Sequence, residues 1–106
     1  MNSPTAAASG SSVVFERAAE VFALLGTSSR LRIVSLLCQQ EMSVGALRSA
    51  LGGSQPGVSQ NLATLYRSGL LTRQRKGASV FYCVNPSHSL LVCGAVSSIL
   101  AAEPSR

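Results

Sequence analysis

Three cysteines and a single histidine are the side chains best suited to reactive chemistry in this chain of 106 residues. Cys38, Cys83 and Cys93 could react as thiolates with oxidants or sulfur species. They could also bind soft metal or metalloid ions, with His88 as a nitrogen ligand. The cysteines are odd in number and lack paired spacing, so we expect thiols rather than structural disulfides in a reducing compartment. Simpler roles remain open, because Cys38 also fits a helical core and a lone histidine is commonly a surface residue at a helix start.

Enzymatic acid–base chemistry has few possible participants in this sequence. The chain contains no Asp, and its 4 acidic residues are all Glu. With one histidine and no glycine-rich phosphate loop, the usual hydrolase and transferase arrangements lack parts. A pair of His88 with Cys83 or Cys93 would have no orienting carboxylate nearby. We therefore do not expect an enzyme.

A second group of side chains, between positions 54 and 67, suits the recognition of nucleic-acid bases. Val58, Leu62 and Leu65 share the inward face of a predicted helix, so the polar residues must lie on its other faces. Short amides and hydroxyls can hydrogen-bond to base edges without repelling phosphate. The residues predicted to reach base edges are Gln55, Ser59 and Gln60, with Asn61 as a further candidate and Tyr66 and Arg67 nearer the backbone. Ser54, at the predicted start of the helix, is also expected among the DNA-binding residues.

A basic hairpin follows this helix. Strand-like alternation runs out over 70–75 and returns over 78–84, around a tip at Lys76-Gly77. We expect Arg73, Arg75 and Lys76 to contact phosphates, although charged hairpin tips can also serve solubility alone. No acidic residue occurs between Glu41 and Glu103, so the whole middle of the chain is free of negative charge.

The elements that would position these residues can be read from periodicity and capping. Helices are predicted over 13–26, 29–39, 43–51, 54–67 and 87–102, with a disordered arm at 1–12 and a tail at 103–106. Thr27, Ser43 and Ser54 would cap helices, and Pro56 is tolerated in a first turn. The predicted fold is therefore mainly α with a small β-hairpin (α+β), a winged helix-turn-helix in a single domain over 13–102.

Apolar stripes indicate what each helix buries. The second helix should bury Leu31, Val34 and Cys38, with Ile33 and Leu37 alongside. The third should bury Val44, Leu47, Ala50 and Leu51. The last helix is apolar around most of its circumference, which one small chain cannot cover. We expect it to pair with its copy across a two-fold axis, with help from the first helix, in a homodimer.

Composition restricts the partners. A net charge of +5 and a sequence pI of about 9.9 favour an anionic partner such as nucleic acid. No apolar run approaches the length of a membrane span, so no membrane partner is expected. The first residues lack the basic start and apolar stretch of a secretion signal, which predicts a cytoplasmic protein.

About residues 15–100 resemble the ArsR/SmtB family of dimeric winged-helix repressors, through the run LRIVSLL…MSVGAL…SQPGVSQNLATLYRSGLLTRQRKGASVFYCV. The similarity is most specific in SQPGVSQNLATLYRSGLL, which matches the family's recognition helix, and in Val80-Phe81-Tyr82, where its wing ends. The resemblance implies a repressor that leaves its operator when a metal, a metalloid or a reactive sulfur species binds the dimer.

The family's sensing sites carry over incompletely. A cysteine of its metal motif is replaced within Glu41-Met42-Ser43-Val44, and only His88 has a counterpart in its zinc site on the last helix. A sulfur-sensing branch carries one cysteine on the second helix and one on the last, which Cys38 and Cys93 resemble in placement.

Three interpretations of the effector follow. Cys38 and Cys93 could form a redox pair. The cysteines could instead assemble with His88 around a thiophilic metal or metalloid ion. In the third interpretation all the cysteines fill the core and sense nothing. The sequence predicts a DNA-binding repressor of a near-palindromic double-stranded operator, released by a thiol-reactive or thiophilic inducer. The alternative is a winged-helix regulator, or a protein-interaction module, whose cysteines have no sensing role.

Overall fold

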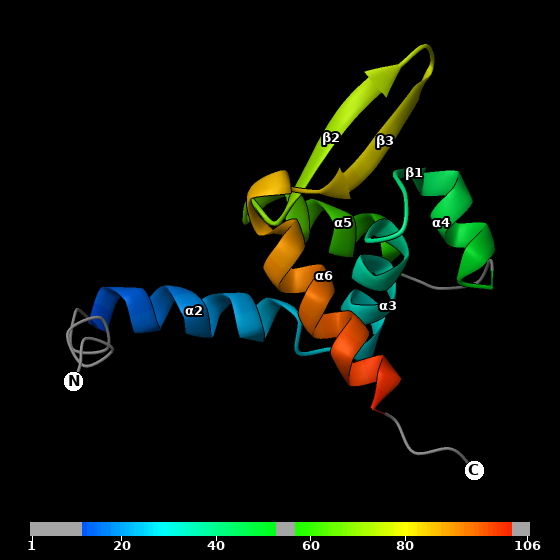
Figure 1. Cartoon of the computed structure of the whole chain (residues 1–106). Helices are drawn as coiled ribbons and strands as arrows, with labels where there is room; N and C mark the ends of the chain where they lie inside the picture. The colour runs from blue at the N-terminus through cyan, green and yellow to red at the C-terminus, as the bar shows by residue number, and fades with distance from the viewer. Residues whose placement is uncertain (1–11, 53–56, 103–106) are drawn as a thin grey trace.

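The computed structural model describes residues 12–52 and 57–102. Expectations for most of the arm, for the tail at 103–106 and for Ser54, Gln55 and Pro56 concern residues outside those ranges. Ser12, which we expected in the arm, starts a helix. The elements are α2 (Ser12–Leu24), α3 (Ser28–Leu37), β1 (Met42–Ser43), α4 (Val44–Ala50), α5 (Val58–Arg67), β2 (Leu71–Lys76), β3 (Ser79–Val84) and α6 (Pro86–Ala101). This order confirms the mainly α class with an antiparallel hairpin (Figure 1).

Side-chain caps explain where three of the helices begin. The Thr27 hydroxyl accepts a hydrogen bond from the backbone N–H of Arg30 and starts α3. Ser43 caps α4 in the same way, as its sequence position predicted. Asn85 caps α6 through the N–H of Ser87, and Pro86 occupies the first turn, where a missing N–H costs little.

Helix α5 begins four residues later than the sequence indicated. Gly57 stands at its N-cap with φ at +81°, a left-handed conformation that glycine adopts without the Cβ penalty of other residues. The predicted start of this helix at Ser54 is therefore wrong, because the helix begins at Val58 with Gly57 as its N-cap. The inward face predicted for α5 is confirmed, since Val58, Leu62 and Leu65 are its buried residues.

The sheet has three strands in the order β1-β3-β2, all antiparallel. The hairpin of β2 and β3 has the register Leu71↔Val84 through Lys76↔Ser79, so its tip lies at Gly77 and Ala78. The short strand β1 was not predicted. It pairs Met42 with Tyr82 and thereby anchors the segment before α4 to the β2–β3 hairpin, which is the wing of the winged helix-turn-helix.

The core lies where α3, α4, α5 and α6 meet the sheet. It is built from aliphatic side chains of all these elements, with Ile33, Val34, Leu47, Leu62, Leu65 and Leu71 the most deeply buried. Two predictions were wrong: Leu31 is 38% exposed and Ala50 is exposed. The buried residues of α3 are Ile33, Val34 and Leu37, and the helix packs against α5, α6 and β3. Val34 was predicted on the buried line, with Ile33 and Leu37 beside it.

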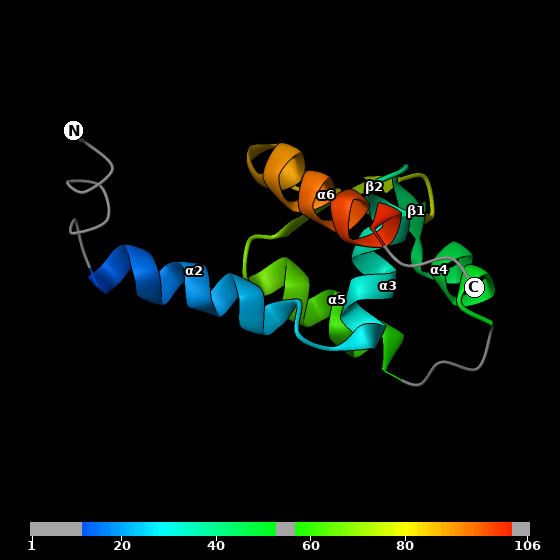
Figure 2. The ribbon, with the colours of Figure 1, turned by 60° about the horizontal axis from the view of Figure 1, so that its bottom comes forward.

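Two helices leave large apolar side chains uncovered in the single chain. Figures 1 and 2 both show α2 extending away from the body of the molecule, and none of its residues is buried. Phe22 of α2 is 73% exposed. On α6, Leu90 is 91% and Leu91 77% exposed. This exposure is expected of surfaces that a second copy covers.

Candidate nucleic-acid interface and cysteine pair

The exposed face of α5 presents an uncharged amide and a hydroxyl. Ser59 and Gln60 both lie exposed in the first turns of the helix, as the sequence predicted. The Gln60 side chain makes no hydrogen bond within the described part of the chain, so its amide is available to an outside partner. Ser59 is engaged: Nη2 of Arg48, on α4, donates to its Oγ at 3.0 Å. Sequence reasoning had not placed Arg48 at this face, because the contact depends on how α4 and α5 pack.

Asn61 has a different environment from its neighbour Gln60. It is half-buried, and its Oδ1 accepts a hydrogen bond from Nε of Arg30 at 3.3 Å. We predicted that Asn61 reads a base, but its amide oxygen already accepts a hydrogen bond within the protein. Only the first residue of the pattern Gln60-Asn61 faces outward with its side chain unbound.

The wing is joined to the end of α5 through Arg73. Its guanidinium lies over the Tyr66 ring at 4.1 Å from the centroid, and its Nη1 donates to the Tyr82 hydroxyl at 3.5 Å. The hydrogen bond to Tyr82 raises the pKa of Arg73. The exposed Tyr66, next to Arg67 in the chain, therefore packs its ring against the Arg73 guanidinium of the wing.

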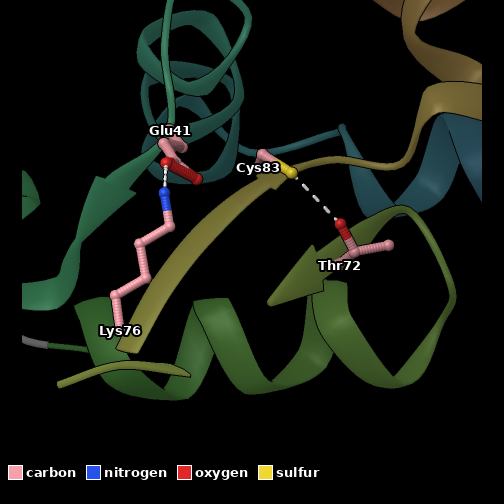
Figure 3. A network of polar contacts seen from close by, with 4 residues as sticks. All are labelled: Glu41, Thr72, Lys76 and Cys83. Carbon is pink, nitrogen blue, oxygen red and sulfur yellow. Dashed lines mark hydrogen bonds and ion pairs between the residues drawn. The ribbon is translucent and has the colours of Figure 1, made fainter. Parts of the chain in front are cut away.

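Lys76 forms an ion pair with Glu41 (Figure 3). The Lys76 ammonium also lies 5.3 Å from the centre of the Phe81 ring. The carboxylate that precedes β1 therefore neutralises one of the wing's cations. Arg75 is exposed and makes no side-chain hydrogen bond or ion pair within residues 12–52 and 57–102. Arg73 and Lys76 would have to give up a hydrogen bond or an ion pair to described residues before contacting phosphate, whereas Arg75 would not.

Cys38 and Cys93 are joined by a disulfide, with their Cα atoms 5.6 Å apart. The expectation of thiols at these two positions is wrong for this structure. Cys38 is the C-cap of α3 and Cys93 lies in α6, and the packing of these two helices brings the residues within bridging range. Spacing in the sequence could not reveal this, because 55 positions separate them.

The remaining candidate ligands do not assemble around the pair. Cys83 keeps a thiol, whose sulfur lies 3.1 Å from the Thr72 hydroxyl across the β2–β3 ladder (Figure 3). His88 is half-buried in the first turn of α6. In the part of the chain that the structure describes, no group of three or more His, Cys, Asp or Glu side chains could hold a metal ion. A site made of Cys38, Cys83, His88 and Cys93 in one chain is therefore not formed.

Comparisons with known proteins identify the family. A family model described as "Bacterial regulatory protein, arsR family" matches residues 27–73, which run from the cap of α3 into β2. The biofilm growth-associated repressor of Xylella fastidiosa (strain 9a5c) is 35% identical over 91 residues, which cover 83% of this chain and 80% of that protein. The chain belongs to the ArsR family.

Further ArsR-type relatives agree with this assignment. The HTH-type transcriptional regulator KmtR of Mycobacterium tuberculosis is 36% identical over 86 residues, which cover 80% of this chain and 66% of that regulator. A solved homodimeric winged helix-turn-helix DNA-binding domain from Mycobacterium bovis, Mb0332, matches with a TM-score of 0.72 and 27% identity over 84% of this chain and 82% of that one.

The ArsR-family match gives the general activity. The chain is an ArsR-family transcriptional repressor, and regulators of this family bind DNA and form dimers. The relatives are transcriptional regulators and not enzymes, as the missing acid–base groups indicated. No helix among the described residues is long and apolar enough to cross a membrane.

Proposed function

We propose that this repressor binds a near-palindromic operator as a homodimer and releases it when Cys38 and Cys93 become linked. The observation that carries the proposal is the bond between these residues, which ties the end of α3 to α6. Helix α3 belongs to the DNA-binding body, whereas α6 presents the apolar face offered to a second copy. A covalent link between them can therefore change how two reading helices are spaced.

The chemistry requires an oxidant of stated class. Forming the disulfide removes two protons and two electrons from the Cys38 and Cys93 thiols. A hydrogen disulfide ion accepts them and leaves as hydrogen sulfide and a hydrosulfide ion. One thiolate first attacks a sulfur of the oxidant to give a persulfide, and the other then displaces the outer sulfur. These two steps convert the half-buried Cys38 and Cys93 from thiols to a disulfide, and they require no other side chain of the protein.

On the DNA, each protomer would insert α5 into a major groove and lay its wing over the adjacent backbone. Gln60 and Ser59 would contact base edges, and Arg67, Arg73, Arg75 and Lys76 would contact phosphates. The roles of Ser54 and Gln55 follow from their place before α5 in the sequence. Two copies would read half-sites about one helical turn apart.

Selection from a random pool of duplex DNA, followed by affinity measurements on the dithiol and disulfide forms, tests the proposal. We expect one enriched near-palindrome, bound much more tightly by the dithiol form. Cys38→Ser and Cys93→Ser should abolish the response to polysulfide, whereas Cys83→Ser is the matched control and should keep it. A response that survives both of the first two variants would overturn the redox assignment. Parallel arms with As(III) and Zn(II) test release by a thiophilic ion.

A further inference from the structure

Arg30 connects three helices with one side chain. Its Nη1 donates to the backbone carbonyl of Leu24, the last residue of α2, at 2.9 Å. Its Nε donates to Oδ1 of Asn61 in α5 at 3.3 Å. Arg30 itself lies in the first turn of α3, where its backbone N–H is held by Thr27. Figure 2 shows the end of α2, the start of α3 and α5 meeting in this region.

The geometry requires an arginine. Two acceptors on different helices are reached by two different nitrogens of one planar group, which a lysine ammonium cannot reproduce with the same fixed directions. The Leu24 carbonyl closes α2 and has no i+4 partner within that helix. Both hydrogen bonds are partly buried, so water replaces them poorly when the guanidinium is removed.

Helix α2 has few other attachments to the body. None of its residues is buried, and among the described residues Leu24, its last residue, and Leu25, which follows it, pack against the core. The Arg30 bridge therefore fixes the direction in which this helix leaves the body, and the same group holds α5. The Arg30 guanidinium therefore bonds both α2, the helix with an exposed face for a second copy, and α5, the helix proposed to enter DNA.

We propose that Arg30 and Asn61 form a positioning pair that sets α5 relative to α2 and α3, and that Asn61 acts through this pair and not by reading a base. The proposal rests on the DNA-binding part of the proposed function and is independent of the cysteine pair. It separates adjacent residues of α5 by role: Gln60 would read sequence, whereas Asn61 would orient the helix that carries it.

The two roles predict different binding profiles. A positioning residue alters every base contact of α5 together, so its loss weakens binding to all operator variants by the same factor. A reading residue loses preference at one base pair. Arg30 and Asn61 act through one hydrogen bond, so removing both should cost no more than the larger single loss.

The experiment measures the affinity of the full chain for the selected operator and for its single-base variants, in both cysteine redox states. The variants are Arg30→Gln, Arg30→Lys, Asn61→Ala and the double variant Arg30→Gln/Asn61→Ala. Arg32→Gln is the matched control, because it removes the same charge from an exposed position on the same helix. Thermal unfolding of each variant checks the fold, and Arg30→Lys serves if Arg30→Gln does not fold.

We expect Arg30→Gln and Asn61→Ala each to weaken binding about fivefold or more at every operator variant, with unchanged base preference and a non-additive double variant. Arg30→Lys should fall between these and the original chain. The proposal is overturned if Arg30→Gln matches Arg32→Gln, if the double variant is additive, or if Asn61→Ala relaxes preference at one base pair. A chain without substitutions that prefers no operator overturns the proposed function as well, and that result is recognised before any variant is compared.

Discussion

Gln60 and Asn61 adjoin in the chain, yet their amides have different surroundings. The Gln60 amide is exposed beyond the surface of α5, whereas the Asn61 oxygen is bound by Arg30. Adjacent positions on a helix point about 100° apart, so one residue can face DNA while the next faces the protein. Whether a polar side chain of α5 can contact a base therefore depends on whether its donors and acceptors are already hydrogen-bonded within the protein.

Replacing Gln60 should change sequence preference, and replacing Arg75 should change salt dependence. Gln60→Ala is expected to cost about 1–3 kcal/mol at one base pair and to relax discrimination there. Arg75→Ala should weaken binding to all duplexes and reduce the slope of log affinity against log salt by about one. Titrations of operator variants at several salt concentrations measure both. A uniform loss for Gln60→Ala would contradict its base contact.

Under the proposed function, Glu41 would compete with DNA for Lys76. Glu41→Gln should release the lysine, raise affinity for any duplex and steepen the salt slope by about one. Stability should change by less than about 0.5 kcal/mol, because both groups of the pair are well exposed. Glu20→Gln on α2 makes the same charge change away from the wing and serves as the control. Equal effects of the two variants on DNA affinity would exclude a specific competition at Lys76.

Secondary structure was largely predictable, and the contacts between elements were not. The period of Val58, Leu62 and Leu65 fixed the inward face of α5 correctly. The conformation of Gly57 and the pairing of β1 with β3 escaped prediction, because each depends on backbone placed by distant parts of the chain. For the same reason the hydrogen bond from Arg30 to Asn61, 31 positions away, leaves no pattern in the sequence.

The outward face of α6 should be required for pairing. Leu91 makes little contact within its own chain, so Leu91→Glu is expected to leave the helical content unchanged while shifting the protein to monomers. Operator affinity should fall with it, since the two half-sites would then be bound separately. Sedimentation velocity across chain concentrations measures the shift, with Gln39→Glu, exposed after α3, as the control. An unchanged dimer would mean that this face is not the interface.

The cysteine bridge also bears on the stability of the whole molecule. It closes a loop across 55 positions, which restricts the unfolded chain and should stabilise the fold by about 2–4 kcal/mol over the dithiol form. Urea unfolding at one fixed chain concentration, with and without reductant, measures the difference. In Cys83→Ser the difference should persist, and in Cys38→Ser it should vanish. Coincident unfolding curves for the two forms of the original chain would show that the bridge adds no stability.

The exposure of α2 affects how quickly an unpaired chain is degraded in the cell. A helix of 13 residues with no buried side chain is marginal in water, so it should unravel in an unpaired molecule and expose its backbone to proteases. Dilute, newly made chains would then be degraded faster than assembled ones. A cell making little of this repressor would hold less of it than synthesis alone implies, and the onset of repression with rising expression would be correspondingly abrupt.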